Sequence, residues 1–150
     1  MRLPHKSSAP SARAAAALTA ARLAEHVDFF SIGTNDLAQY GLAVDRANRD
    51  VSAFYRPLHP AVLRLIQLVA EAGRTARRPV AVCGELAADP LGAVALIGLG
   101  ITDLSVTPVA IPEVKDRILA LDAARARGLA HRALEAAEAA DVERILGGLA

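Results

Sequence analysis

The chain has 150 residues, of which 53% are apolar, so it is long enough for one domain or a part of one and is too apolar for global disorder. Its 17 basic side chains nearly balance its 16 acidic ones, which argues against nucleic-acid binding, because nucleic-acid binders usually carry a basic stripe. A lone cysteine, Cys83, excludes an internal disulfide, and no stretch approaches the roughly 20 apolar residues of a membrane span, so we expect a soluble, cytoplasmic α/β protein.

The first 24 residues are basic, contain three serines and have no acidic residue. This composition is compatible with an organelle transit peptide or a weak secretory signal around residues 14–20. The alternative that we favour is a disordered start, over residues 1 to about 10, that runs into an alanine-rich helix. The apolar residues that would share one face of this helix are Ala14, Leu18, Ala21 and Ala24.

Three short apolar runs are predicted to be strands, and each is followed by residues typical of turns. Residues 27–32 (VDFFSI) lead into GTND, residues 80–83 (VAVC) end at Gly84, and residues 104–107 (LSVT) end at Pro108. None of the three runs alternates cleanly between polar and apolar side chains, which predicts strands that are buried on both faces.

Helical periodicity follows each of these runs. We predict a helix over residues 59–77 with Pro60 in its first turn, and a helix over residues 90–99 with Asp89 as its N-cap. Three further helices are predicted at the C-terminus, over residues 111–121, 123–139 and 141–149. Alternating strands and helices predict parallel βα units. Because a (β/α)8 barrel needs about 250 residues, the chain accounts for only about three-eighths of one.

Polar side chains follow the first predicted strand, at the edge of a parallel sheet where ligands usually bind. Asn35 and Asp36 offer oxygen ligands for a hard cation, although on residue type alone a helix cap is favoured. Arg46 could clamp a phosphate through two hydrogen bonds, whereas the simpler interpretation is a surface ion pair with Asp45 or Asp50.

Cys83 ends the second predicted strand. A thiol in this place can donate or accept a proton. The residue type alone favours an inert, buried side chain, because free cysteine usually behaves as a small hydrophobe. Both interpretations remain open from the residues themselves.

Several segments together resemble enzyme I, the phosphoenolpyruvate (PEP)–protein phosphotransferase of the bacterial sugar phosphotransferase system. They are FFSIGTNDL at residues 29–37, QY at 39–40, AVDR at 43–46, HPAVL at 59–63 and CGELA at 83–87. Pyruvate phosphate dikinase and PEP synthase share a looser version of this pattern. The resemblance implies that residues 14–150 form the C-terminal part of a PEP-utilising TIM barrel, about three βα units plus C-terminal helices, behind an atypical start at residues 1–13.

The resemblance also implies a role for each candidate residue. Asp36 is expected to bind Mg²⁺, Asn35 to help hold the phosphate, and Arg46 to grip PEP, while Cys83 is expected to protonate the enolate as pyruvate forms. The implied partners are PEP and the phosphocarrier protein HPr, and the implied assembly is a homodimer through the barrel domain.

The sequence departs from the family pattern at one metal ligand. The family's second magnesium carboxylate, a glutamate, would fall at Ala12, Arg13 and Ala14, where there is none. The phospho-accepting histidine domain and the other phosphate-gripping arginines are also absent from the sequence. Two hypotheses follow: the chain is part of a working phosphotransferase, or it is a catalytically incompetent module that only dimerises or binds a partner.

Overall fold

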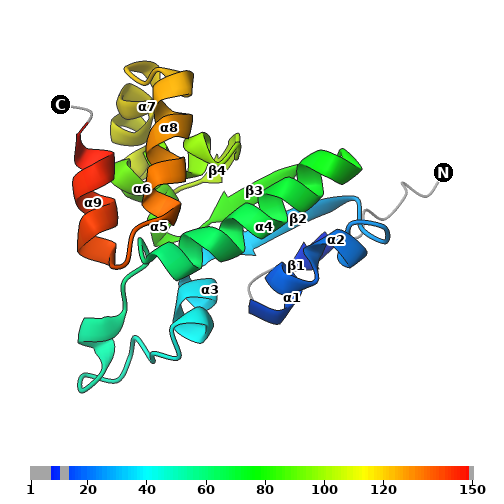
Figure 1. The fold of residues 1–150 in the computed structure, drawn as a ribbon, viewed down its shortest axis with the longest axis horizontal. Helices are drawn as coiled ribbons and strands as arrows, with labels where there is room; N and C mark the ends of the chain where they lie inside the picture. The colour runs from blue at the N-terminus through cyan, green and yellow to red at the C-terminus, as the bar shows by residue number, and fades with distance from the viewer. Residues whose placement is uncertain (1–7, 11–13, 149–150) are drawn as a thin grey trace.

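A small parallel β-sheet with helices packed on it forms the framework of the protein, as seen in a computed structural model that describes residues 8–10 and 14–148 (Figure 1). Four parallel strands lie in the order β1-β2-β3-β4. Their bounds are Ser8–Pro10 for β1, Phe29–Gly33 for β2, Val80–Cys83 for β3 and Asp103–Ser105 for β4. The predicted α/β class with parallel strands is therefore confirmed.

Three of these strands were predicted from the sequence. Strand β3 has the predicted bounds, and β2 and β4 are shifted by one or two residues at their ends. Strand β1 was not expected, because residues 8–10 fall in the stretch for which we predicted disorder; they pair in parallel with the first residues of β2. The remainder of that stretch, residues 1–7 and 11–13, lies outside the described residues.

Helices connect the strands and follow the last one. The longest is α4, Pro60–Ala76, where the His59 imidazole caps the first turn by accepting the Ala61 N–H at 3.1 Å. The helix α6, Pro90–Gly98, is capped as predicted, by the Asp89 carboxylate. The other helices are α1 (Ala14–Leu18), α2 (Ala20–Leu23), α3 (Thr34–Gly41), α5 (Glu85–Ala88), α7 (Ile111–Leu119), α8 (Ala123–Leu134) and α9 (Ala139–Gly147), with 3-10 turns η1 (Ser52–Phe54) and η2 (Pro108–Ala110).

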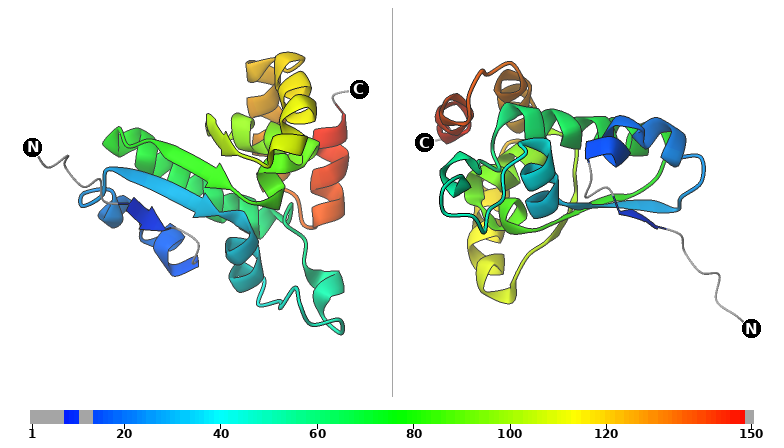
Figure 2. Two further views of the ribbon diagram at one scale, coloured as in Figure 1. Left: turned by 180° about the vertical axis from the view of Figure 1, so that it is seen from behind. Right: turned by 90° about the horizontal axis from the view of Figure 1, so that it is seen from below.

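One face of the sheet is covered and carries the core. Phe30 and Ile32 of β2 and Val82 of β3 are fully buried, and α4 packs along these two strands. The residues between them on the same strands are less buried, so their side chains lie on the opposite face, which no described helix covers over β2 and β3 (Figure 2). The prediction that both faces are buried is therefore wrong, because the apolar residues Phe29 and Ala81 occupy less buried positions and hide the alternation in the sequence.

The alanine-rich segment is helical, but a different face is buried. Ala17, Ala20 and Ala24 are at most 3% exposed, whereas Leu18, which we expected to share a face with Ala24, is 68% exposed. Both α1 and α2 pack against α4. The smallest side chains face α4, because only alanine lets the helix backbones approach closely.

The C-terminal helices dock on the rest of the domain. Helix α8 packs against α6, and the Arg64 guanidinium of α4 donates two hydrogen bonds, 2.9 and 2.6 Å long, to the carbonyl of Leu134 at the end of α8. Helix α8 thus ends five residues before residue 139, where its end was predicted. Among the described residues, no helix combines the length and apolar character that crossing a bilayer requires.

Candidate functional site

The candidate site lies at the edge of the sheet where β2 and β3 end. Gly33 of β2 and Cys83 of β3 are paired in the parallel ladder, so the turns that follow both strands start at the same level. Helix α3 begins at Thr34 and α5 begins at Glu85. Residues 50 positions apart in the sequence therefore meet at one edge, as the topology of parallel sheets requires.

Thr34 ties the two strand ends together. Its side chain is fully buried, and its hydroxyl donates to the Cys83 carbonyl at 3.2 Å. Gly84 follows with a φ of +119°, a conformation that disfavours any side chain. A Cβ atom there would lie against the Thr34 hydroxyl and 2.9 Å from Oδ1 of Asn35, so the close approach of the two turns depends on glycine.

Asn35 connects the two turns instead of capping its own helix. The N-cap of α3 is Gly33, so the expected cap by Asn35 and Asp36 is wrong. The Asn35 amide reaches across to Glu85: its Oδ1 accepts the Glu85 N–H at 3.0 Å, and its Nδ2 donates to the Glu85 carboxylate at 3.4 Å. The position of Asn35 is thereby fixed by a contact with a distant part of the chain.

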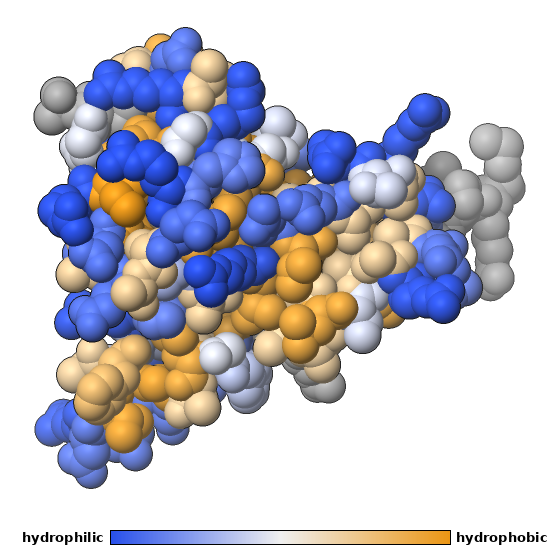
Figure 3. Space-filling model, viewed as in Figure 1, coloured by the Kyte–Doolittle hydropathy of each residue, from blue (hydrophilic) through white to orange (hydrophobic). Residues whose placement is uncertain are grey.

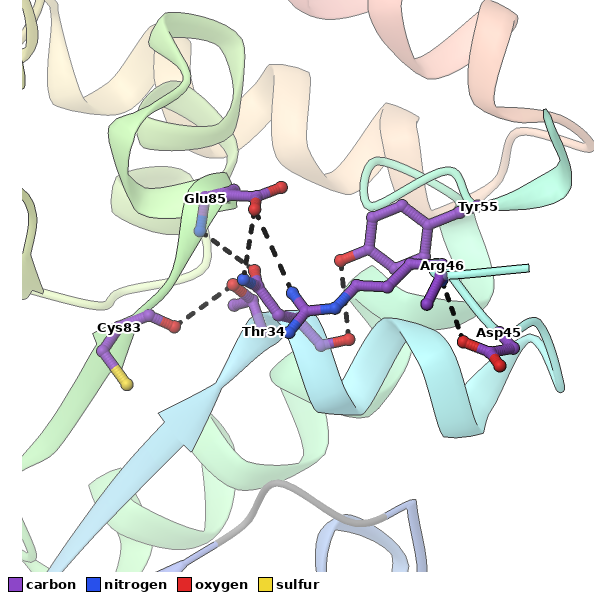
Figure 4. Close-up of polar contacts among 8 residues, drawn as sticks. Thr34, Asp45, Arg46, Tyr55, Cys83 and Glu85 are labelled. Carbon is purple, nitrogen blue, oxygen red and sulfur yellow. Dashed lines mark hydrogen bonds and ion pairs between the residues drawn. The ribbon is translucent and has the colours of Figure 1, made fainter. Parts of the chain in front are cut away.

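Arg46 and Tyr55 lie beside these two residues (Figure 4). Nη1 of Arg46 lies 4.0 Å from Oε1 of Glu85, and the guanidinium lies close enough to the Tyr55 phenol to lower its pKa. The Tyr55 hydroxyl in turn donates to the Asn35 carbonyl at 3.5 Å. We call Asn35, Arg46, Tyr55 and Glu85 the polar ring. The expected surface pair of Arg46 with a neighbouring aspartate is replaced by this pair with Glu85, and the Asp45 carboxylate instead accepts the Ala47 N–H at 2.9 Å.

The electrostatics of the ring act on Tyr55. Burial raises the pKa of the Tyr55 phenol above its ordinary value of 10.0, and the negative charge of Glu85 raises it further, while Arg46 acts in the opposite direction. Asp36 also raises this pKa, as the smallest of these effects, so its carboxylate lies within electrostatic reach of the ring. The phenol is therefore a hydrogen-bond donor throughout the neutral pH range.

The other two predicted site residues lie beside the ring. Asp36 is exposed in the first turn of α3. Cys83 is also exposed, so it is not the buried side chain that its residue type favoured. Its thiol donates to the Ile32 carbonyl at 3.5 Å, and Figure 4 shows the sulfur pointing away from Glu85 and Arg46. The structure thus brings Asn35 and Arg46 into contact with one partner, and leaves the thiol at the same edge, on the uncovered face of the sheet.

A cavity of about 220 Å³ adjoins the polar ring. Tyr55 and Glu85 form part of its wall, and the remaining lining residues are Arg56, Pro57, Leu58, Leu86, Asp89 and Glu143. The described residues contain no group of three His, Cys, Asp or Glu side chains that could hold a metal ion. In this part of the chain the site thus offers a guanidinium, an amide and a thiol, with exposed carboxylates at Asp36 and Glu85.

Tyr55 and Thr34 were missed by the sequence analysis. Thr34 directly precedes the candidate Asn35 in the sequence. Glu85, which was also missed, follows the candidate Cys83 by two positions. Tyr55 lies in a loop without periodicity, 20 residues from its partner Asn35, and nothing in the local sequence indicates its role.

Comparison with known proteins adds an independent finding. The family model for the PEP-utilising enzyme, PEP-binding domain matches residues 13–123. A multiphosphoryl transfer protein of Xanthomonas campestris pv. campestris is 49% identical over 131 residues, which are 87% of this chain and 16% of that protein. PEP-protein phosphotransferases of Haemophilus influenzae and Haloferax volcanii are 42% and 47% identical over 87% and 88% of this chain, and 23% of each of those proteins. The chain thus spans between about a sixth and a quarter of the length of these relatives.

Proposed function

The chain belongs to the PEP-utilising enzymes through their PEP-binding domain, and from this membership we propose that it is the C-terminal part of a PEP–protein phosphotransferase of the enzyme I kind. In this proposal the four strands are part of a (β/α)8 barrel that the rest of a longer polypeptide, or another chain, completes. The reaction belongs to a cytoplasmic sugar phosphotransferase system, with PEP as donor and a protein histidine, ultimately that of HPr, as acceptor.

The observation that carries this proposal is the meeting of Asn35 and Arg46 at one edge of the sheet. Both interact with the same residue, Glu85, although Asn35 lies in the first turn of α3 and Arg46 in the loop after that helix. A guanidinium and an amide side by side present several N–H donors in one direction, which suits the oxygens of a phosphate group. We assign the phosphate of PEP to these two side chains.

The residues proposed to bind Mg²⁺ form a less complete site than those proposed to bind the phosphate. Mg²⁺ is usually held by one or two carboxylates together with waters and substrate phosphate oxygens. Asp36 supplies one exposed carboxylate close to the polar ring, and no group of three ligating side chains gathers in the described part of the chain. Asp36 therefore fits as a single protein ligand whose companions are oxygens of PEP. The bound ion would neutralise charge on the transferred phosphoryl group.

Cys83 is the proposed acid for the second half of the reaction. When the bond between phosphorus and the enol oxygen breaks, the phosphoryl group passes to the acceptor histidine and leaves the enolate of pyruvate. The enolate takes a proton on its terminal carbon from the Cys83 thiol, which becomes a thiolate. Exposure of Cys83 on the uncovered face of the sheet supports this assignment, because the proton donor must be accessible to the ligand.

The rival hypothesis is a module that only dimerises or binds a partner. It is favoured by the apolar surface over α1 and α4 (Figure 3), where Leu18 and Leu68 are 68% and 41% exposed. Exposed apolar area of this kind marks an interaction surface when it is contiguous. A homodimer through the barrel domain is compatible with both hypotheses.

One assay separates the two. The purified chain is incubated with PEP and Mg²⁺, with and without a separately supplied N-terminal portion of a relative that carries the phospho-accepting histidine, and pyruvate formation is followed. The enzyme hypothesis predicts pyruvate when the portion is added, and its loss in Cys83→Ala. Pyruvate in neither mixture leaves the module as the remaining function.

Binding is tested separately by isothermal titration with PEP. Arg46→Ala should weaken binding by about tenfold or more, since a hydrogen bond to a charged group contributes about 1.5–3 kcal/mol. Arg49→Ala, which removes an exposed arginine of the same loop, is the matched control. Equal affinities of the two variants would contradict the assignment of Arg46 to the phosphate.

A further inference from the structure

The guanidinium of Arg46 is engaged by groups of the protein itself. Its Nη1 faces the carboxylate of Glu85 across 4.0 Å, beside the phenol of Tyr55 (Figure 4). An anionic ligand that binds Arg46 must therefore enter a place where a carboxylate of the protein itself now supplies the negative charge.

The contact between Arg46 and Glu85 is suited to being broken. A separation of 4.0 Å exceeds hydrogen-bond length, so the attraction is mainly electrostatic. The side chains are 44% and 70% exposed, and ion pairs so open to solvent contribute little to stability. A phosphate dianion, which can form charge-assisted hydrogen bonds with the guanidinium, outcompetes a partner of this strength.

We propose that Glu85 is an internal counter-ion of this site, which holds the Arg46 guanidinium in place in the free protein and is displaced from it by the phosphate of the ligand. The proposal rests on the proposed function, because it takes Arg46 as the residue that binds the phosphate. Glu85 positions Arg46 and does not itself touch the reacting atoms.

The remaining contacts of Glu85 allow this exchange without disturbing the fold. The strong link between the two turns runs from the backbone N–H of Glu85 to Asn35, and this link is independent of the carboxylate. The carboxylate has only the longer contact with the Asn35 amide, at 3.4 Å, to retain it beside Arg46. When the ligand takes Arg46, the Glu85 side chain can turn toward solvent while Tyr55 and Asn35 keep their places. After phosphoryl transfer the carboxylate recaptures Arg46, which favours release of the product.

Glu85→Gln is the decisive variant. Glutamine keeps an oxygen that accepts from the Asn35 amide and keeps the backbone N–H, but removes the charge. Since 70% of the Glu85 side chain is exposed, the substitution should leave the thermal unfolding midpoint unchanged. The matched control is Glu143→Gln, which neutralises a carboxylate on α9 that lines the adjoining cavity but lies outside the polar ring.

Tyr55 itself serves as the reporter. The chain has no tryptophan and only two tyrosines, so Tyr40→Phe, at a side chain 61% exposed, leaves Tyr55 as the single tyrosine. Tyrosine fluorescence of the full 150-residue chain with this substitution is titrated with PEP and, separately, with inorganic phosphate. We expect Glu85→Gln to bind each probe about two- to fivefold more tightly than the parent at low salt. The gain should shrink as ionic strength rises, because exposed charges are screened.

The possible results separate two failures. If the parent binds both probes and Arg46→Ala does not, but Glu85→Gln binds no more tightly than Glu143→Gln, the counter-ion proposal is overturned and the proposed function stands. If the parent, Glu85→Gln and Arg46→Ala are all folded and show no saturable response, both proposals are overturned. An equal gain in Glu85→Gln and Glu143→Gln also rejects the proposal, since a general change in charge would then explain it.

Discussion

Gly84 is the residue on which the geometry of the site most depends, and replacing it with alanine tests that dependence. Its φ of +119° and ψ of −177° lie in a region that only glycine populates readily, so alanine there should cost about 1–3 kcal/mol of backbone strain. The new Cβ would also lie 2.9 Å from Oδ1 of Asn35 and against the hydroxyl of Thr34. Overlap of this kind costs a further amount of about 1–3 kcal/mol.

The expected result is a free energy of unfolding that is lower by about 2–6 kcal/mol, which is a large part of the stability of a typical domain. The measurement is urea denaturation followed by circular dichroism at 222 nm. Substitutions at two other glycines separate the cost of backbone strain from the cost of steric overlap. Gly100→Ala has a positive φ of +89° but no atom within 4 Å of the new Cβ, so it reports backbone strain alone, about 1–2 kcal/mol. Gly128→Ala lies within α8, also in open space, and should stabilise by about 0.5–1 kcal/mol.

The same variant has a consequence for binding. Because the Cβ atom that Gly84→Ala introduces pushes against Asn35, the contact between Asn35 and Glu85 must lengthen, and PEP affinity should fall even under conditions where the variant remains folded. Two results would refute the reasoning: a loss of stability no larger than that of Gly100→Ala, or an unchanged PEP affinity in the folded variant. Either would mean that the two turns are not packed against each other as described.

Three further predictions concern a cap, a docking contact and a titration. Asp89→Ala should lower the free energy of unfolding by about 0.5–2 kcal/mol in the same urea assay, since it leaves two N–H groups of α6 without their acceptor. Arg64→Met should keep the packing of α4 but leave the last carbonyl of α8 unbonded; faster amide exchange confined to α8 and α9 is the expected outcome, and uniform exchange would contradict it. In a Tyr40→Phe chain, absorbance at 295 nm should show Tyr55 titrating above pH 10.0, and Glu85→Gln should lower that pKa, because the negative charge that raises it is gone. Because the pKa of Tyr55 is higher in the folded than in the unfolded protein, its contribution to stability is complete below pH 10 and is lost as the pH rises through the folded pKa. A Tyr55 phenol that titrates below pH 10 would refute this assignment.

The sequence determined the local elements and the candidate residues. Strand β3, the start of α4 and the cap of α6 follow from short-range chemistry: a β-branched run that ends before a glycine, Pro60 in a first turn, and Asp89 before a helix. Residue type and position marked Asn35, Asp36, Arg46 and Cys83 as candidates, and the resemblance to enzyme I implied their roles. Comparison with known proteins then established the family to which the chain belongs.

Only the tertiary structure decided how these residues meet. The partner of Arg46 is Glu85, 39 positions along the chain, and the alternatives drawn from sequence neighbours were wrong because a nearby aspartate is satisfied by a backbone N–H. Likewise β1, the buried face of α1 and α2, and the place of Tyr55 depend on contacts between segments far apart in the sequence. Periodicity and capping are encoded within a few residues, whereas the polar ring exists only because two parallel strands end at the same level and a loop folds back over their ends.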